Sequence, residues 1–227
     1  MKVDIQYRPS NTAAKITLNT GEECTTEAGS MISMSSGLTV ETTTHKKGKG
    51  SLLKSLKRAF AGESFFLNHY DSTKENSELW ISSHLPGDMC EVQLNGVGLV
   101  VQSSSFMACS KNIDLDTGWQ GFKTLLSGEG LFWLKLSGSG NAVLNSFGSI
   151  YCVDVEDEYI VDSGHIVAFE ETLNFKISKA GSSWLHSFMG GEGFVCRFQG
   201  KGKIWCQSHN PSSFGHSLTP YLRPKKR

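Results

Sequence analysis

A Gly-Glu pair that leads into an apolar run occurs three times along this chain. The pairs are Gly62-Glu63, Gly128-Glu129 and Gly191-Glu192, and they lie 66 and 63 residues apart. After one small residue, each pair passes into an apolar run typical of a strand. A nearly fixed spacing of this length is typical of one structural unit repeated in tandem. The chain is therefore predicted to fold as three related copies.

The flanking segments follow one order in all three copies. Upstream of each pair, small residues pass into alternating apolar residues, which predicts a turn followed by a strand. These segments are residues 28–34, 103–109 and 162–169. Downstream of each pair, a second strand-like run ends near a serine. These runs are residues 79–82, 143–146 and 204–208. We place the copies at residues 1–88, 89–150 and 151–211, followed by a C-terminal tail at 212–227.

Each copy also carries apolar residues at helical spacing before its Gly-Glu pair, which predicts three short helical inserts. The first insert spans residues 51–60, and its apolar face consists of Leu52, Leu53, Leu56 and Phe60. Its opposite face carries Lys54, Lys57 and Arg58. Solvated surface is the favoured interpretation of this basic face, because the helix is only about three turns long. The alternative is contact with an anionic membrane surface or a partner.

The remaining sequence alternates apolar and polar residues at a period of two, as half-buried antiparallel strands do. Clear examples are residues 91–94, 98–101, 150–155 and 159–161. Many short strands separated by turn signals indicate a sandwich or barrel. We therefore predict a single compact all-β domain over 1–227, built from three jelly-roll-like repeats that each carry a short helical insert.

The glycines and glutamates that recur in the repeat have a structural interpretation. A glycine beside each glutamate permits positive φ and close backbone approach where helix gives way to strand. Glu63, Glu129 and Glu192 are expected to accept backbone hydrogen bonds at three equivalent corners. In the alternative, they converge near a pseudo-threefold axis, where they would repel one another or require a cation. The first role is favoured, because a buried acidic cluster costs far more than a turn-stabilising carboxylate.

Charge and export signals exclude several classes of protein. Lysine plus arginine and aspartate plus glutamate number 22 each, so no global field draws the chain to nucleic acid. Charged residues interrupt the N-terminal segment, and no stretch approaches the roughly 20 apolar residues of a membrane span. The protein is expected to be soluble and cytoplasmic. Its six cysteines form no CxxC pair and are expected to be reduced, most of them acting as small buried apolar residues.

No motif in the sequence predicts a catalytic, cofactor-binding or metal-binding residue, and we expect no enzyme activity and no cofactor. The seven histidines form no HxH or HExxH pattern, and no serine or cysteine lies in a nucleophile elbow. His165, close to Asp162, is the histidine with the most suggestive surroundings, although a role under a turn is favoured. Gly138-Ser139-Gly140 and Gly200-Lys201-Gly202 are predicted to be hairpin turns.

The third copy resembles the signature of the altered-inheritance-of-mitochondria protein family. The matching parts are residues 161–170, Gly190-Gly191-Glu192-Gly193-Phe194 and Gly200-Lys201-Gly202-Lys203-Ile204-Trp205. The resemblance extends from Ala28 to Ser208 and implies a fold similar to the Trp RNA-binding attenuation protein, a shortened double-stranded β-helix repeated within one polypeptide. It implies no activity, because the family has no established catalytic residues. The first copy departs from the pattern, with Ser64 in place of the second glycine.

The sequence favours a non-enzymatic binding or scaffold protein that forms a homo-oligomer through sheet edges or helix faces. Short repeated sheets leave edges that must be covered, and self-association covers them. A cupin-like protein that binds a metal or small molecule is one alternative. RNA binding or association with a membrane surface is another, although zero net charge makes nucleic acid the less favoured partner.

Overall fold

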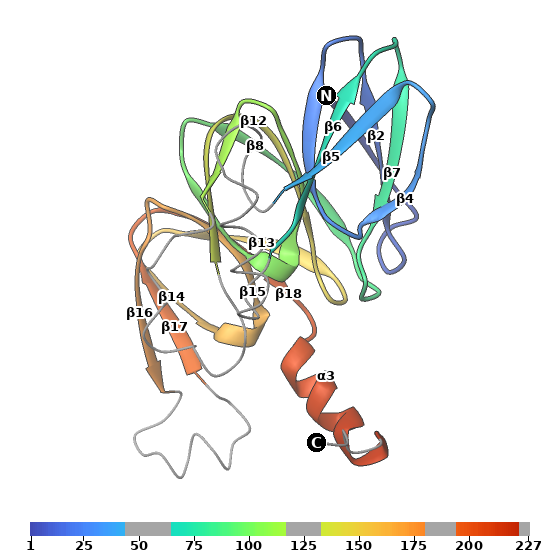
Figure 1. The fold of residues 1–227 in the computed structure, drawn as a ribbon. Helices are drawn as coiled ribbons and strands as arrows, with labels where there is room; N and C mark the ends of the chain where they lie inside the picture. The colour runs from blue at the N-terminus through green and yellow to red at the C-terminus, as the bar shows by residue number, and fades with distance from the viewer. Residues whose placement is uncertain (44–64, 117–132, 180–193, 223–227) are drawn as a thin grey trace.

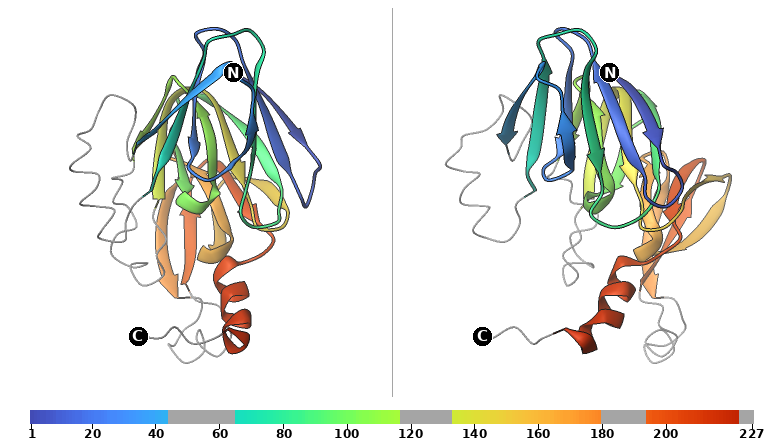
Figure 2. Two further views of the ribbon diagram at one scale, coloured as in Figure 1. Left: turned by 45° about the vertical axis from the view of Figure 1, so that its right-hand side comes forward. Right: turned by 90° about the vertical axis from the view of Figure 1, so that its right-hand side faces the viewer.

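The computed structural model describes residues 1–43, 65–116, 133–179 and 194–222, and it confirms the all-β prediction. The strands form three tiers, coloured blue to teal, green to yellow, and orange to red in Figure 1. Figure 2 shows the same order from two further sides, with the N-terminus in the upper tier and helix α3 (Pro211–Leu218) at the lower end of the molecule.

The strands fall into three groups in chain order. The first group is β1 (Lys2–Gln6), β2 (Ala13–Leu18), β3 (Glu23–Glu27), β4 (Met31–Met34), β5 (Leu38–Thr43), β6 (Leu67–Ser72) and β7 (Ser77–Ser82). The second is β8 (Met89–Asn95), β9 (Leu99–Gln102), β10 (Phe106–Ser110), β11 (Ile113–Asp116) and β12 (Trp133–Asn145). The third is β13 (Ile150–Val155), β14 (Glu158–Asp162), β15 (Ile166–Glu170), β16 (Asn174–Lys179), β17 (Phe194–Gln199) and β18 (Gly202–Gln207).

The strand pairing follows one antiparallel scheme in all three groups, which we call the first, second and third units. The third unit contains the sheets β13-β18-β15 and β14-β17-β16. In the second, the corresponding orders are β8-β12-β10 and β9-β12-β11, because the long strand β12 serves both sheets. In the first they are β2-β7-β4 and β3-β6-β5, with β1 added outside β2.

Neighbouring units are joined by pairing between strands of different units. Strand β10 of the second unit pairs with β3 of the first, and β15 of the third pairs with β9 of the second. Each join therefore merges a sheet of one unit with a sheet of the next. These pairings are non-local contacts that bring together residues 67 to 86 positions apart, and the buried residues around them form the core.

Short turns lead into the strands that make these joins. Ser103–Ser105 and Ser163–His165 are single 3-10 turns directly before β10 and β15. The Asp162 carboxylate accepts a hydrogen bond from the Gly164 N–H at 2.8 Å and so caps its turn. His165 Nδ1 lies 2.8 Å from the Gln207 carbonyl oxygen, which fixes the turn to β18. This is the structural role that the sequence favours for His165.

The prediction of hairpin turns at the two glycine-rich segments is wrong. β12 runs through Gly138 and Gly140 as one strand, with φ of +114° and +146° at these residues. Gly200 (φ +115°) connects β17 and β18, which pair with other strands and belong to different sheets. In both places the chain crosses from one sheet of a unit to the other. Glycine is needed there because positive φ is strained for other residues.

Helical structure in the described residues is confined to short segments. Helix α3 (Pro211–Leu218) lies in the segment predicted as a C-terminal tail, and Asn210 caps it by accepting hydrogen bonds from the N–H groups of Ser212 and Ser213. Its Phe214 ring lies 5.2 Å from that of Phe147. The predicted helical inserts, including 51–60, lie outside the described residues. No helix in the described part is long and apolar enough to cross a membrane.

An ion pair fixes the connection between the first and second units. Arg8 Nε and Nη2 each donate to a carboxylate oxygen of Asp88 at 2.9 Å. Asp88 is 4% exposed and also accepts from the Met89 N–H and from the Thr12 hydroxyl. Burial by itself raises the pKa of Asp88, but these hydrogen bonds and the Arg8 charge outweigh it and hold the pKa below its ordinary value.

We expect Gly138→Ala to lower the free energy of unfolding by about 2 to 4 kcal/mol. An added Cβ would lie 2.4 Å from the Asn112 carbonyl oxygen, and alanine tolerates a φ of +114° poorly. Gly215→Ala in α3 is the control, because nothing lies within 4 Å of its Cβ position and its φ is not positive. Urea denaturation measures both variants. Equal stability of the two would contradict this account of Gly138.

We expect Asp88→Asn to destabilise the protein by about 2 to 4 kcal/mol at pH 7, because it removes the buried charge that accepts four hydrogen bonds. The folded pKa of Asp88 is depressed. The charged group therefore contributes stability above its unfolded pKa, about 3.9, and that stability is lost as pH falls through the folded pKa. The difference between wild type and variant should shrink below about pH 4. A difference that stays constant between pH 7 and pH 3 would count against the ion pair.

Candidate interaction edges

Among the described residues, two strands lack the partner in a neighbouring unit that their equivalents have. In the described part of the chain, β4 pairs only with β7, whereas its equivalents β10 and β15 each pair on both sides. Likewise β14 pairs only with β17, whereas β3 and β9 each pair on both sides. Within the described residues no unit precedes the first or follows the third, so one joining edge remains at each end of the series.

The pairing registers establish which residues are equivalent. Met31, Phe106 and Ile166 each form the first pair with their neighbouring strand, and the same register shift follows in all three. The last pairs in these three registers contain Met34, Cys109 and Phe169, which are therefore equivalent as well. The strands β3, β9 and β14 each end at a turn that leads into β4, β10 or β15. When the three strands are aligned on these turns, Ile160 is equivalent to Thr25 and Val100.

The two unpaired edges expose apolar side chains that are buried at the equivalent positions. On β4 the exposed fractions are 45% for Met31, 57% for Ile32 and 42% for Met34. All equivalent side chains of β10 and β15 are at most 1% exposed. On β14, Tyr159 is 42% and Ile160 45% exposed, although their equivalents in β9, Leu99 and Val100, are at most 2% exposed. These five side chains form the surfaces that we call the β4 edge (Met31, Ile32, Met34) and the β14 edge (Tyr159, Ile160).

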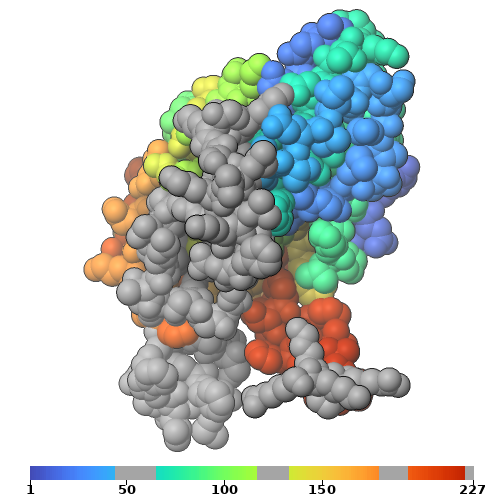
Figure 3. Space-filling view, viewed as in Figure 1, coloured from blue at the N-terminus to red at the C-terminus, as the bar shows by residue number. Residues whose placement is uncertain are grey.

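The edges lie at opposite ends of the molecule. Figure 1 shows β4 on the right, in the first unit, and β14 on the left, in the third. In the space-filling view, the blue atoms of the segment that contains β4 and β5 are open on the right side (Figure 3). Because the two edges are separated in this way, they do not pair with each other within one chain.

Charged side chains, proline and disruptive bulges usually prevent strand addition, and where the two edges carry such features they do not block pairing. The β4 sequence, Met31–Met34, contains no charge. In β14, Glu158 is engaged by Arg197 and Gln199 at 3.3 and 3.1 Å, and Asp162 caps its turn. The bulge in β4 does not prevent pairing, since β10 and β15 contain the same bulge and are paired on both sides.

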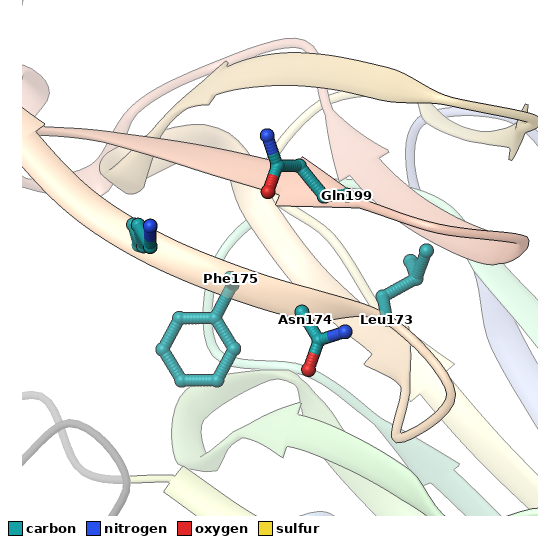
Figure 4. Close-up of a pocket in the computed structure, with 5 residues that line it drawn as sticks. Leu173, Asn174, Phe175 and Gln199 are labelled. Carbon is teal, nitrogen blue, oxygen red and sulfur yellow. The ribbon is translucent and has the colours of Figure 1, made fainter.

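The pockets of the described part offer little for small-molecule chemistry. The larger, with a volume of about 440 Å³, is lined by Leu173, Asn174, Phe175, Lys176 and Gln199. Asn174 and Gln199 lie opposite each other in the register of β16 and β17, and in Figure 4 their side chains extend away from each other. Lys176 is the one charged group of this lining. A single lysine without an acidic or nucleophilic neighbour supplies no acid and base pair.

In the described part of the chain, the His, Cys, Asp and Glu side chains form no metal-binding group, and several thiols are buried and protonated. Within the described ranges, no group of three or more His, Cys, Asp or Glu side chains is placed to hold a metal ion. Four cysteines are buried, Cys90 is partly buried and Cys152 is exposed. Burial raises the pKa of Cys90 and Cys196 to about 12 and that of Cys206 to about 11. These thiols therefore remain protonated at neutral pH, which is the unreactive form.

All the site residues singled out in the sequence lie outside the described residues. They are Lys54, Lys57, Arg58, Gly62, Glu63, Gly128, Glu129, Gly191 and Glu192. The roles predicted for them stay predictions. Sequence reasoning missed the two edges, because β4 is as apolar as β10 and β15 and alternation alone does not reveal which strand lacks a neighbour. The available signal was the position of β4 in the first copy, with no copy before it.

The three units and their two open edges define an all-β protein of serially joined sheets. A family model described as mitochondrial biogenesis AIM24 matches residues 3–209. The chain belongs to this family. An uncharacterized protein of Streptococcus pyogenes serotype M6 is 28% identical over 214 residues, which are 92% of this chain and 86% of that protein. The crystal structure of a Streptococcus pyogenes protein is similar with a TM-score of 0.80 and 26% identity, covering 97% of this chain and 99% of that one.

We expect Met31→Ala and Phe106→Ala to differ sharply although the two residues are equivalent. Phe106 is fully buried, and its truncation should lower the free energy of unfolding by about 3 to 5 kcal/mol. Met31 is 45% exposed in the single chain, so its truncation should cost less than about 1 kcal/mol. Urea denaturation in dilute solution compares them. A similar loss for both would mean that the β4 edge is already buried in the single chain.

Proposed function

We propose that this protein is a non-enzymatic scaffold that self-associates through its sheet edges. The observation that carries the proposal is the exposure of five large apolar side chains on two strands that pair on one side only, whereas the equivalent side chains of β9, β10 and β15 are buried. Unpaired N–H and C=O groups beside exposed apolar residues form a template for strand addition. Association of copies removes both the polar and the apolar surface from water.

The placement of the polar groups supports a structural role. Asp88, Asp162 and His165 are each engaged in hydrogen bonds that hold a turn or a connection between units. Glu171 accepts from the Gly98 N–H and pairs with Lys135, so it links the turn before β9 to the third unit and β12. Polar side chains committed in this way stabilise the arrangement of the sheets.

We expect the sedimentation-derived mass of the protein to increase with concentration from the low micromolar range upward, in whole multiples of the mass of one chain. Because the edges are apolar, association should persist or strengthen at about 1 M salt, whereas association between charged surfaces would weaken. Sedimentation velocity at low and high salt measures this. A single chain at every concentration would contradict the proposal.

A further inference from the structure

We infer that self-association is head to tail, with β4 of one copy pairing antiparallel with β14 of the next. This inference rests on the proposed function and adds the partner and the register to it. The partner is a second copy of this chain. The contact repeats, between molecules, the join that β3 makes with β10 and β9 makes with β15 within the molecule.

The two end sheets are each one half of the joined sheets seen within the chain. Each unit contains two types of sheet, and an internal join places the first type of one unit beside the second type of the preceding unit. The sheet β8-β12-β10 thus lies beside β3-β6-β5, and the sheet β13-β18-β15 lies beside β9-β12-β11. The four-stranded sheet β1-β2-β7-β4 is of the first type, and β14-β17-β16 is of the second. Each ends in the strand that would form the join. One copy therefore offers at one end the half-sheet that the next copy lacks at its other end.

The internal joins also fix the register. Ala108 lies opposite Thr26 and Cys109 opposite Thr25 at one join, and the second join repeats this register with the equivalent residues. Transferred to the ends of the chain, the register places Ser33 of one copy opposite Val161 of the next. Met34 then lies opposite Ile160. Both of these last side chains are exposed, at 42% and 45%.

The core of a unit includes residues from the strand that the following unit adds to it. The core cluster around the first unit includes Met107 and Ala108 from β10 of the second. That of the second unit includes Val167 and Ala168 from β15 of the third. The equivalent residues for the third unit are Ile32 and Ser33 on β4, and in a single chain no following unit brings such residues to it. A second copy would supply them.

Head-to-tail contact has a consequence for the assembly. It joins two different surfaces, so each copy retains one open edge after pairing, and addition continues until a ring closes or a filament forms. Contact of β4 with β4, or of β14 with β14, would instead stop at a dimer. The two arrangements are therefore distinguishable by blocking one edge at a time.

The test uses two variants of the full chain, Ile32→Arg to block the β4 edge and Ile160→Arg to block the β14 edge. A charge that cannot be desolvated opposes pairing at its own edge and leaves the other edge intact. Each variant alone should sediment as a single chain, whereas their 1:1 mixture should form a dimer of one copy of each and nothing larger. Val40→Arg, at a β5 residue that is 47% exposed, is the matched control and should associate as wild type does.

The outcomes separate the inference from the proposed function. If wild type does not associate, both fail. If wild type associates but one variant still dimerises alone, the contact joins identical edges and only the head-to-tail inference is overturned. If both variants associate as wild type does, association uses a surface other than these edges, and the inference fails together with the proposal that the sheet edges are the contact.

Cysteine pairing tests the register independently of the arginine variants. A chain with Met34→Cys and a chain with Ile160→Cys, both carrying Cys152→Ser to remove the exposed native thiol, should form a disulfide-linked pair under mild oxidation. Val40→Cys replaces Met34→Cys in the control mixture, which should give at least tenfold less product. Equal yields in the two mixtures would overturn the predicted register.

Discussion

The pairing of one strand with strands on both of its sides is the interaction on which this structure depends. Strands β10 and β15 each bond to their own unit on one side and to the preceding unit on the other. Side chains on the two faces of such a strand enter two cores, as the adjacent residues Ala108 and Cys109 show by belonging to different clusters. No internal unit is complete without its neighbour. Stability and the order of the units thus come from the same hydrogen bonds and the same buried side chains.

This constraint explains why the two ends of the series differ from its middle. The residues of β4 and β14 have the composition of core strands, and only the lack of a neighbour leaves them exposed. Stability within the chain does not explain exposed apolar residues at both ends, since the single chain gains little from them. The association that we propose would explain them, because the same side chains would then become core residues.

The sequence predicted where turns and strands lie better than it predicted which strands pair with one another. Residues 28–34, 103–109 and 162–169, predicted as turns followed by strands, do lead into β4, β10 and β15, because small residues and alternation act locally. The prediction of hairpins at Gly138 and Gly200 was wrong. Glycine indicates an unusual φ, but it does not indicate whether the strands on either side of it pair with each other. The joins between units were also not predictable, because they depend on contacts far apart in sequence. For the same reason the two open edges could not be predicted, because an edge is a strand without a neighbour and neighbours depend on contacts far apart in sequence.

Hydrogen exchange of the backbone amides tests the central claim most directly, because it reports on each strand separately. In dilute protein, the outward-facing amides of β4 and β14 should exchange rapidly while those of β10 and β15 are protected by their second partner. In concentrated protein, β4 and β14 should gain protection together and to the same extent. Protection that is independent of concentration, or that appears on only one of the two strands, would contradict the claim that one type of strand pairing builds both the chain and its assembly.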